Sequence, residues 1–168
     1  MQYKSKDIAK VSVEMAMSSR EEEQELKDKY TVFADLYMTE NTYLYNDTKM
    51  VLKTLKERGA KIAIISSKTR RRIMQTLTRD KIDDLVEFII GSEDKYAYKP
   101  APDGILEAVK RLNVDKKDVI YIGDNIVDAQ AAQNAQVDFA GVLTGNNIKA
   151  DFAKFPHVKI MNCLQELI

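Results

Sequence analysis

The sequence predicts an α/β protein built on a parallel sheet, with a small helical region on its N-terminal side. Three continuous apolar runs, Ile62–Ile65, Phe88–Ile90 and Val119–Ile122, have the length and composition of strands buried on both faces. Between these runs apolar residues recur at every third or fourth position, which is typical of amphipathic helices. This alternation predicts a three-layer core whose parallel strands are joined by right-handed crossovers.

The other elements of the core follow from the same two periodicities. We expect a first helix from residue 49 that is closed by Gly59, and a second helix through Ile73, Leu77 and Ile82. A third helix is expected to begin at Pro102, with a buried stripe of Ile105, Leu106, Val109 and Leu112. A helix at Asp128–Ala135, strands at Ala140–Leu143 and Val158–Ile160, and a closing helix complete the expected core.

The first 45 residues do not join this alternation and are expected to form part of a helical cap, next to a core at 46–168 that lacks its first strand. Leu26, Tyr30, Phe33 and Tyr37 recur at helical spacing, and Ser19 with Glu22 has the form of a capping box. Alternating apolar residues also allow a strand at 11–17, where helix is favoured.

Composition excludes several classes of protein. Lys+Arg and Asp+Glu both number 26, so the net charge is zero, which argues against a nucleic-acid binder or a basic membrane-surface protein. The single cysteine, Cys163, cannot form an internal disulfide, in keeping with a reducing compartment. Neither a run of about 20 apolar residues nor an N-terminal signal peptide is visible, so we expect a cytoplasmic protein.

Polar residues of three kinds follow the predicted strands, where parallel sheets bind ligands. Ser66 and Ser67 come after the first strand and offer a hydroxyl and amides to an anion, although Ser66 could simply cap a helix. Lys99 precedes a proline-stiffened loop and could present a charge to phosphate or lie in solvent. Asp124 and Asp128 flank a tight turn in Gly-Asp-x-x-x-Asp, which suits Mg²⁺ better than capping alone.

This combination resembles the haloacid dehalogenase superfamily, and within it the phosphoglycolate-phosphatase-like branch with a helical cap and a Rossmann-like core. The resemblance runs from about Tyr45 to Gly145. It implies a Mg²⁺-dependent hydrolase acting on a small phosphorylated metabolite through an aspartyl-phosphate. By position, Ser66 and the Ser67 amide would bind the phosphoryl group, Lys99 would neutralise it, Asp124 would bind Mg²⁺, and Asp128 would orient Lys99 and metal-bound water.

One part of the family pattern is missing from this sequence. The family begins with a strand ending in Asp-x-Asp-x-Thr, whose first aspartate is the nucleophile. The nearest string, Val32–Thr39, has Asp35 but Tyr37 in place of the second acid, so Asp35 is interpreted as a cap-helix residue. We therefore expect an N-terminally incomplete enzyme, inactive as it stands, or a variant that fills the gap differently. The alternative is an inactive relic that binds metal or phosphate or serves as an interaction module.

Further features have structural or open interpretations. Gln136 stands where the family has glycine, which would strain a left-handed backbone. The basic cluster Lys68, Arg70, Arg71 and Arg72 would either attract a phosphorylated substrate or form a solvated helix face. His157 receives no role, and Cys163 is expected in the last helix. The sheet edge left by a missing strand would favour a homo-oligomer.

Overall fold

The computed structural model describes residues 22, 24–26, 29–30, 32–33, 37 and 41–168. The chain divides into two units, residues 1–43 and 44–168. In the first unit the described residues from 22 to 37 are helical, and the rings of Phe33 and Tyr37 lie 4.4 Å apart, which confirms the predicted stripe at that point. Asp35, Ser19 and the segment 11–17 lie outside the described residues, and the assignment of a cap to 1–45 stays a prediction.

The second unit begins with helix α3, Thr48–Glu57. Gly59 ends it with φ at +84°, a left-handed conformation that glycine adopts without strain. The amides of Gly59 and Ala60 donate to the carbonyls of Lys56 and Leu55, the pair of bonds that defines a Schellman motif. The predicted glycine stop is confirmed.

The remaining elements alternate as the sequence predicts. In chain order they are β1 (Ala63–Ile65), α4 (Arg70–Arg79), the 3₁₀ turn η1 (Asp83–Leu85), β2 (Phe88–Ile90), α5 (Asp103–Leu112), η2 (Lys116–Asp118), β3 (Ile120–Gly123), α6 (Ile126–Ala135), β4 (Asp138–Val142), α7 (Lys149–Phe152), β5 (Lys159–Met161) and η3 (Leu164–Leu167).

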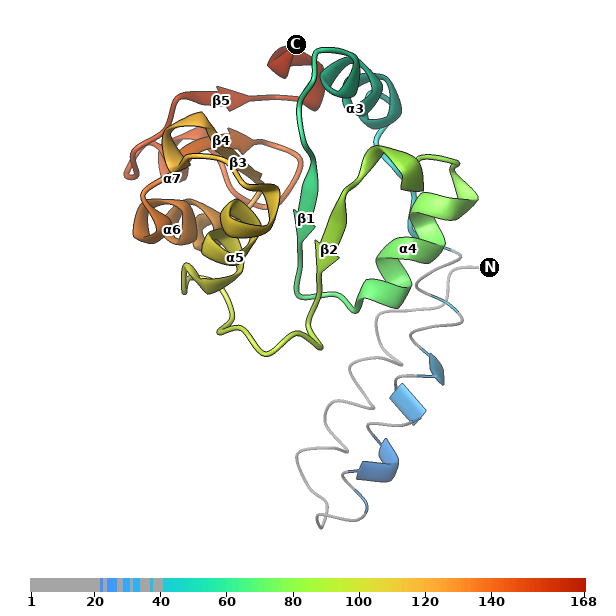
Figure 1. The fold of residues 1–168 in the computed structure, drawn as a ribbon. Helices are drawn as coiled ribbons and strands as arrows, with labels where there is room; N and C mark the ends of the chain where they lie inside the picture. The colour runs from blue at the N-terminus through green and yellow to red at the C-terminus, as the bar shows by residue number, and fades with distance from the viewer. Residues whose placement is uncertain (1–21, 23, 27–28, 31, 34–36, 38–40) are drawn as a thin grey trace. The chain divides into compact units, whose positions relative to one another are not determined.

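The five strands form two parallel sheets, where we expected one. β1 pairs with β2, and β3, β4 and β5 form a separate sheet in that order. Figure 1 shows β1 and β2 side by side, with the other three strands grouped apart from them. Within residues 41–168, β1 and β3 therefore each have a single hydrogen-bonded neighbour.

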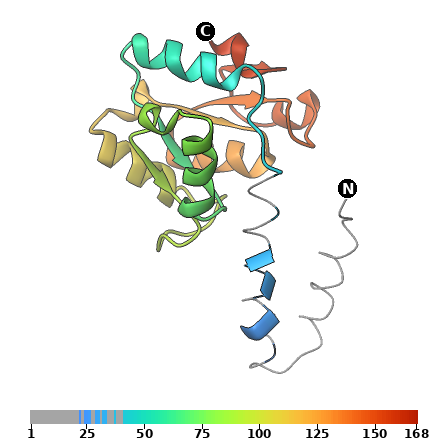
Figure 2. The same cartoon turned by 90° about the vertical axis from the view of Figure 1, so that its right-hand side faces the viewer.

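Helices cover both faces of these strands. Ile64 and Ile89 pack with Leu52 of α3 and Leu77 of α4 in one apolar cluster. On the other face Ile65 packs with α5, α6 and β4 in a larger cluster that contains Phe139 and Phe152. Figure 2 shows α3 beside the C-terminal segment. There the Asp47 carboxylate accepts a hydrogen bond of 2.8 Å from the backbone N–H of Gln165.

Four details differ from or refine the sequence prediction. Ile82 is fully buried but lies beyond the end of α4, because the helix stops at Arg79. Leu106 is 37% exposed, since α5 turns Gly104, Ile105, Ala108 and Val109 to the core instead. Cys163 precedes the last turn rather than lying in a helix. Gln136 is left-handed, with φ at 60°, as the family glycine would be.

In the part of the chain that the structure describes, no helix combines the length and apolarity needed to cross a bilayer.

Candidate active site

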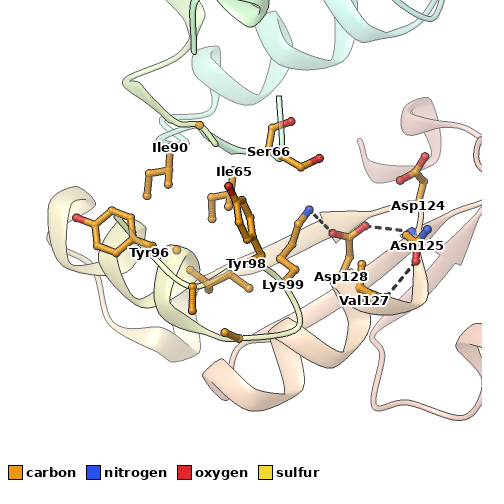
Figure 3. Close-up of a pocket in the computed structure, with 16 residues that line it drawn as sticks. Ile65, Ser66, Ile90, Tyr96, Tyr98, Lys99, Asp124, Asn125, Val127 and Asp128 are labelled. Carbon is orange, nitrogen blue, oxygen red and sulfur yellow. Dashed lines mark hydrogen bonds and ion pairs between the residues drawn. The ribbon is translucent and has the colours of Figure 1, made fainter. Parts of the chain in front are cut away.

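A pocket of about 370 Å³ lies where the two sheets present their carboxyl ends. The loop after β1, the loop between β2 and α5, and the turn from β3 into α6 supply its walls. These three segments bring together all five residues that the sequence singles out. They are Ser66, Ser67, Lys99, Asp124 and Asp128. Figure 3 shows Lys99 and Asp128 facing each other, with Ser66 and Asp124 to either side of them.

Lys99 and Asp128 form the ion pair of this pocket. The Lys99 Nζ lies 2.6 Å from Asp128 Oδ1, and the two side chains are 23% and 5% exposed. Loop and helix are joined a second time where Asn134 of α6 donates to the Pro100 carbonyl at 2.9 Å. The Lys99 side chain is therefore held at its ammonium by the ion pair and at its backbone by a fixed loop.

Asp128 is buried because the strand beside it has no side chain at Gly123. A Cβ on Gly123 would lie 2.3 Å from the Asp128 Cβ, so only glycine lets α6 approach this closely. The second oxygen of Asp128, Oδ2, accepts a hydrogen bond of 3.1 Å from the Asn125 amide, which completes a capping box at the start of α6. Both carboxylate oxygens of Asp128 are thus engaged within the protein.

Asp124 is in the opposite situation. Its side chain is exposed, and no hydrogen bond or ion pair from the described residues engages its carboxylate. The loop after β4 approaches it at Gly145, where a Cβ would lie 2.8 Å from Asp124 Oδ2. A single open carboxylate fits Mg²⁺, which uses one or two carboxylates together with waters and substrate phosphate. Among the described residues no group of three His, Cys, Asp or Glu side chains could hold a metal by itself.

Ser66 does not cap α4, whose N-cap residue is Thr69. The Ser66 Oγ accepts a hydrogen bond of 3.1 Å from the Lys68 amide, which leaves its own proton available for donation into the pocket. The first amide of α4, on Arg70, is already bound by the Glu93 carboxylate at 2.9 and 3.1 Å. An anion bound here would therefore use Ser66, Ser67 and Lys99 rather than the start of α4.

Tyr121 contacts two residues of the pocket, and sequence reasoning missed it. Its hydroxyl lies 3.3 Å from Lys99 Nζ and 3.4 Å from Asp128 Oδ1. Alternation along β3 could have found it, because residues 121 and 123 point to the same face of the strand. Tyr96 and Tyr98, also missed, line the outer wall of the pocket.

Burial and neighbouring charges shift the pKa values of Lys99 and Tyr121 in opposite directions. Burial by itself would lower the pKa of the Lys99 ammonium, but Tyr121 and Asp128 outweigh it and the pKa is raised. Burial raises the pKa of Tyr121 to about 12, with the Lys99 charge opposing the shift. At neutral pH the phenol is protonated, so the ammonium charge is balanced by the Asp128 carboxylate.

Within the basic cluster, Arg70 is engaged in the fold. The Arg70 guanidinium binds the Asp94 carboxylate at 2.8 Å and donates to the Ile89 carbonyl at 3.1 Å. His157 is exposed, is absent from the pocket lining, and contacts the Phe155 carbonyl.

The geometry described so far is that of a polar pocket at the carboxyl ends of parallel strands in an α/β core, and comparison with known proteins assigns the family. The family model for haloacid dehalogenase-like hydrolases matches residues 2–142. A solved structure from Bacteroides fragilis, assigned to haloacid dehalogenase-like hydrolases, superposes with a TM-score of 0.83 at 38% identity. The match covers 91% of this chain and 73% of that one. The chain belongs to the haloacid dehalogenase-like hydrolase family.

Curated relatives carry the names of two phosphate-releasing activities. The phosphoglycolate phosphatase of Colwellia psychrerythraea is 32% identical over 95% of this chain and 75% of its own length. The pyrophosphatase PpaX of Listeria monocytogenes is 35% identical over 58% of this chain. The chain spans 45% of that pyrophosphatase, so it covers less than two thirds of some of the relatives it matches.

Proposed function

We propose that this protein is a Mg²⁺-dependent phosphatase that acts on a small phosphorylated metabolite, in the manner of the phosphoglycolate phosphatases it resembles. The observation that carries the proposal is the convergence of three unlike groups on one pocket. A hydroxyl from Ser66, an ammonium from Lys99 and an open carboxylate from Asp124 come from three different strand ends. Separate structural roles give no reason for these groups to meet.

In this reaction the residues of the pocket bind and orient the phosphoryl group. Lys99 neutralises part of its charge, and the Ser66 hydroxyl with the Ser67 amide donates hydrogen bonds to its oxygens. Asp128 keeps Lys99 charged and directed into the pocket, because the buried pair is only 2.6 Å apart. Asp124 would hold Mg²⁺, which supplies positive charge to the phosphoryl oxygens and to the attacking group.

The nucleophile of the family mechanism is an aspartate that becomes phosphorylated and is then hydrolysed. Asp124 and Asp128 are the two aspartates that line the pocket, and neither suits this role. Asp128 is engaged through both oxygens, and Asp124 is needed for the metal. We therefore place the nucleophile on a segment outside the described residues.

The two separate sheets support this placement. Buried strand edges leave backbone N–H and C=O groups unpaired, which costs free energy. One further parallel strand between β1 and β3 would pair both edges and join the sheets, and its carboxyl end would reach the pocket. An aspartate at that end would face Lys99. The same unpaired edges would favour self-association of a chain that lacks such a strand.

A second candidate function is a phosphate- or metal-binding module without catalysis. It is favoured by one observation, that the described pocket contains binding groups and no aspartate free to act as the nucleophile. Reading the coding DNA upstream of Met1 separates the two: an apolar strand ending in Asp-x-Asp-x-Thr supports the enzyme, and a stop codon close upstream supports the module.

The phosphate site itself is tested by thermal shift with inorganic phosphate. A ligand that binds the folded state raises the melting temperature. We expect Lys99→Ala and Ser66→Ala each to reduce that rise, and the double variant to lose less than the sum, because both residues contact one ligand. An unchanged rise in Lys99→Ala would remove Lys99 from the site, and the absence of any rise in the unmodified chain would count against the proposed function.

A further inference from the structure

We infer that Tyr121 is a positioning residue, whose hydroxyl fixes the direction in which the Lys99 ammonium presents its remaining N–H to the pocket. This inference rests on the proposed function only for its consequence, the binding of phosphate. The positioning itself follows from the arrangement of Tyr121, Lys99 and Asp128.

The three polar groups form a closed triangle. Lys99 Nζ lies 2.6 Å from Asp128 Oδ1 and 3.3 Å from the Tyr121 hydroxyl, and that hydroxyl lies 3.4 Å from the same Oδ1. An ammonium can only donate, so the Tyr121 oxygen must accept from Lys99. The phenol proton is then directed to Asp128. The direction of every hydrogen bond in the triangle is therefore determined.

Lys99 makes its contact with the hydroxyl and not with the face of the ring. Its Nζ lies 5.9 Å from the ring centroid, near the outer limit for a cation–π contact, whereas the hydroxyl is much closer. An ammonium has three N–H donors, and two of them have partners among the described residues. With two directions fixed, the tetrahedral geometry of Nζ sets the third.

A second partner matters because lysine is otherwise poorly directed. Its four-carbon stem is flexible, and a single ion pair leaves the ammonium free to rotate about the Nζ–Oδ1 line. Tyr121 can supply the second fixed point because its own ring is held by the apolar cluster beneath the pocket. Gly123, two residues along the same strand face, leaves the space in which Asp128 meets both partners.

The experiment removes the Tyr121 hydroxyl and observes the ammonium directly. In ¹⁵N-labelled protein, the Lys99 ammonium signal is assigned by its loss in Lys99→Ala. In Tyr121→Phe we expect the Lys99 ammonium protons to exchange with water severalfold faster and the Lys99 signal to broaden. Tyr45→Phe is the matched control, since it removes a phenol hydroxyl that donates to the Thr144 carbonyl at 3.0 Å. An unchanged Lys99 signal in Tyr121→Phe would overturn the inference.

Calorimetric titration with inorganic phosphate then tests the consequence. Tyr121→Phe should weaken binding about three- to tenfold in the unmodified chain, the effect of one lost hydrogen bond. In a Lys99→Ala background it should have almost no effect, because Tyr121 acts through Lys99. An equal loss in both backgrounds would show a general structural role and overturn the inference. If the unmodified chain does not bind phosphate, the proposed function fails, while the ammonium signal still decides the positioning.

Discussion

Asp128 occupies the space that a side chain on Gly123 would need. An added Cβ on Gly123 would lie 2.3 Å from the Asp128 Cβ and 2.5 Å from its Cγ, closer than non-bonded carbons approach. Strand β3 and helix α6 can therefore pack this closely only because residue 123 has no side chain. Because Asp128 is the partner of Lys99, the same glycine also sets the position of the ammonium.

Gly123→Ala should displace Asp128 and weaken phosphate binding. Since α6 must shift or Asp128 must change rotamer, we expect a loss of about 1–3 kcal/mol in the free energy of unfolding. Phosphate affinity, measured by calorimetry, should fall because the Lys99–Asp128 pair is broken. Gly59→Ala is the control: it strains a left-handed residue by about 1 kcal/mol with no atom within 4 Å, so it should leave phosphate affinity unchanged. Equal phosphate affinity in both variants would contradict the steric role of Gly123.

Much of the core could be predicted because its elements are locally specified. Phe88–Ile90 is β2 with the predicted bounds, and Gly59 ends α3 because only that residue adopts φ of +84° freely. The pocket residues were found because parallel strands end at one edge, so residues after β1 and β3 converge whatever lies between them.

The remainder depends on tertiary contacts that periodicity does not report. Leu106 fits a helical stripe but is exposed, because α5 packs against β1 through Gly104 instead. A Cβ added to Gly104 would lie 3.1 Å from the Ile65 side chain. Tyr121 belongs to an ordinary apolar strand, and its role depends on a lysine 22 residues earlier. The division into two sheets follows from which strands pair, which no local pattern encodes.

Asp128→Asn should destabilise the protein more than the loss of any surface acid. The substitution leaves Lys99, whose side chain is 23% exposed, without its counter-charge, and breaking such a pair costs about 3–5 kcal/mol. Asp115→Asn is the control, because its 3.8 Å pair with Lys117 is 77% exposed on both sides and should contribute less than about 1 kcal/mol. Urea unfolding of the two variants measures the difference. Similar midpoints would show that the Lys99–Asp128 pair is not stabilising.

Asp124→Asn should abolish what Mg²⁺ binding the chain has. One carboxylate with waters gives weak binding, so a calorimetric titration at millimolar Mg²⁺ is the appropriate measurement. Asp138→Asn serves as control, since Asp138 is an exposed acid at the opposite, amino end of β4. If Asp124→Asn binds Mg²⁺ as tightly as the unmodified chain does, the metal assignment is wrong.

Tyr121→Phe should make the stability of the protein less sensitive to alkaline pH. Burial raises the pKa of Tyr121 to about 12, from 10.0 for an ordinary phenol. Between these pH values the unfolded chain loses the phenol proton while the folded protein retains it, so the folded state binds more protons and the free energy of unfolding falls as pH rises. The loss begins near pH 10 and is complete near pH 12, and two pKa units correspond to about 3 kcal/mol at most.

The Lys99 ammonium, whose pKa Tyr121 and Asp128 raise, adds a loss in the same direction as the pH rises from its ordinary value of 10.5 through the raised one. The Phe variant keeps the Asp128 partner but loses the contribution of Tyr121 to this shift. Urea unfolding at intervals from pH 8 to pH 12 should therefore give curves that converge, with Tyr121→Phe the less stable protein at neutral pH and the less pH-sensitive one above pH 10. Tyr45→Phe, which also removes one phenol, should follow the unmodified chain. Parallel curves for Tyr121→Phe and the unmodified protein would mean that the Tyr121 hydroxyl is not held in the buried, protonated state on which its contact with Lys99 depends.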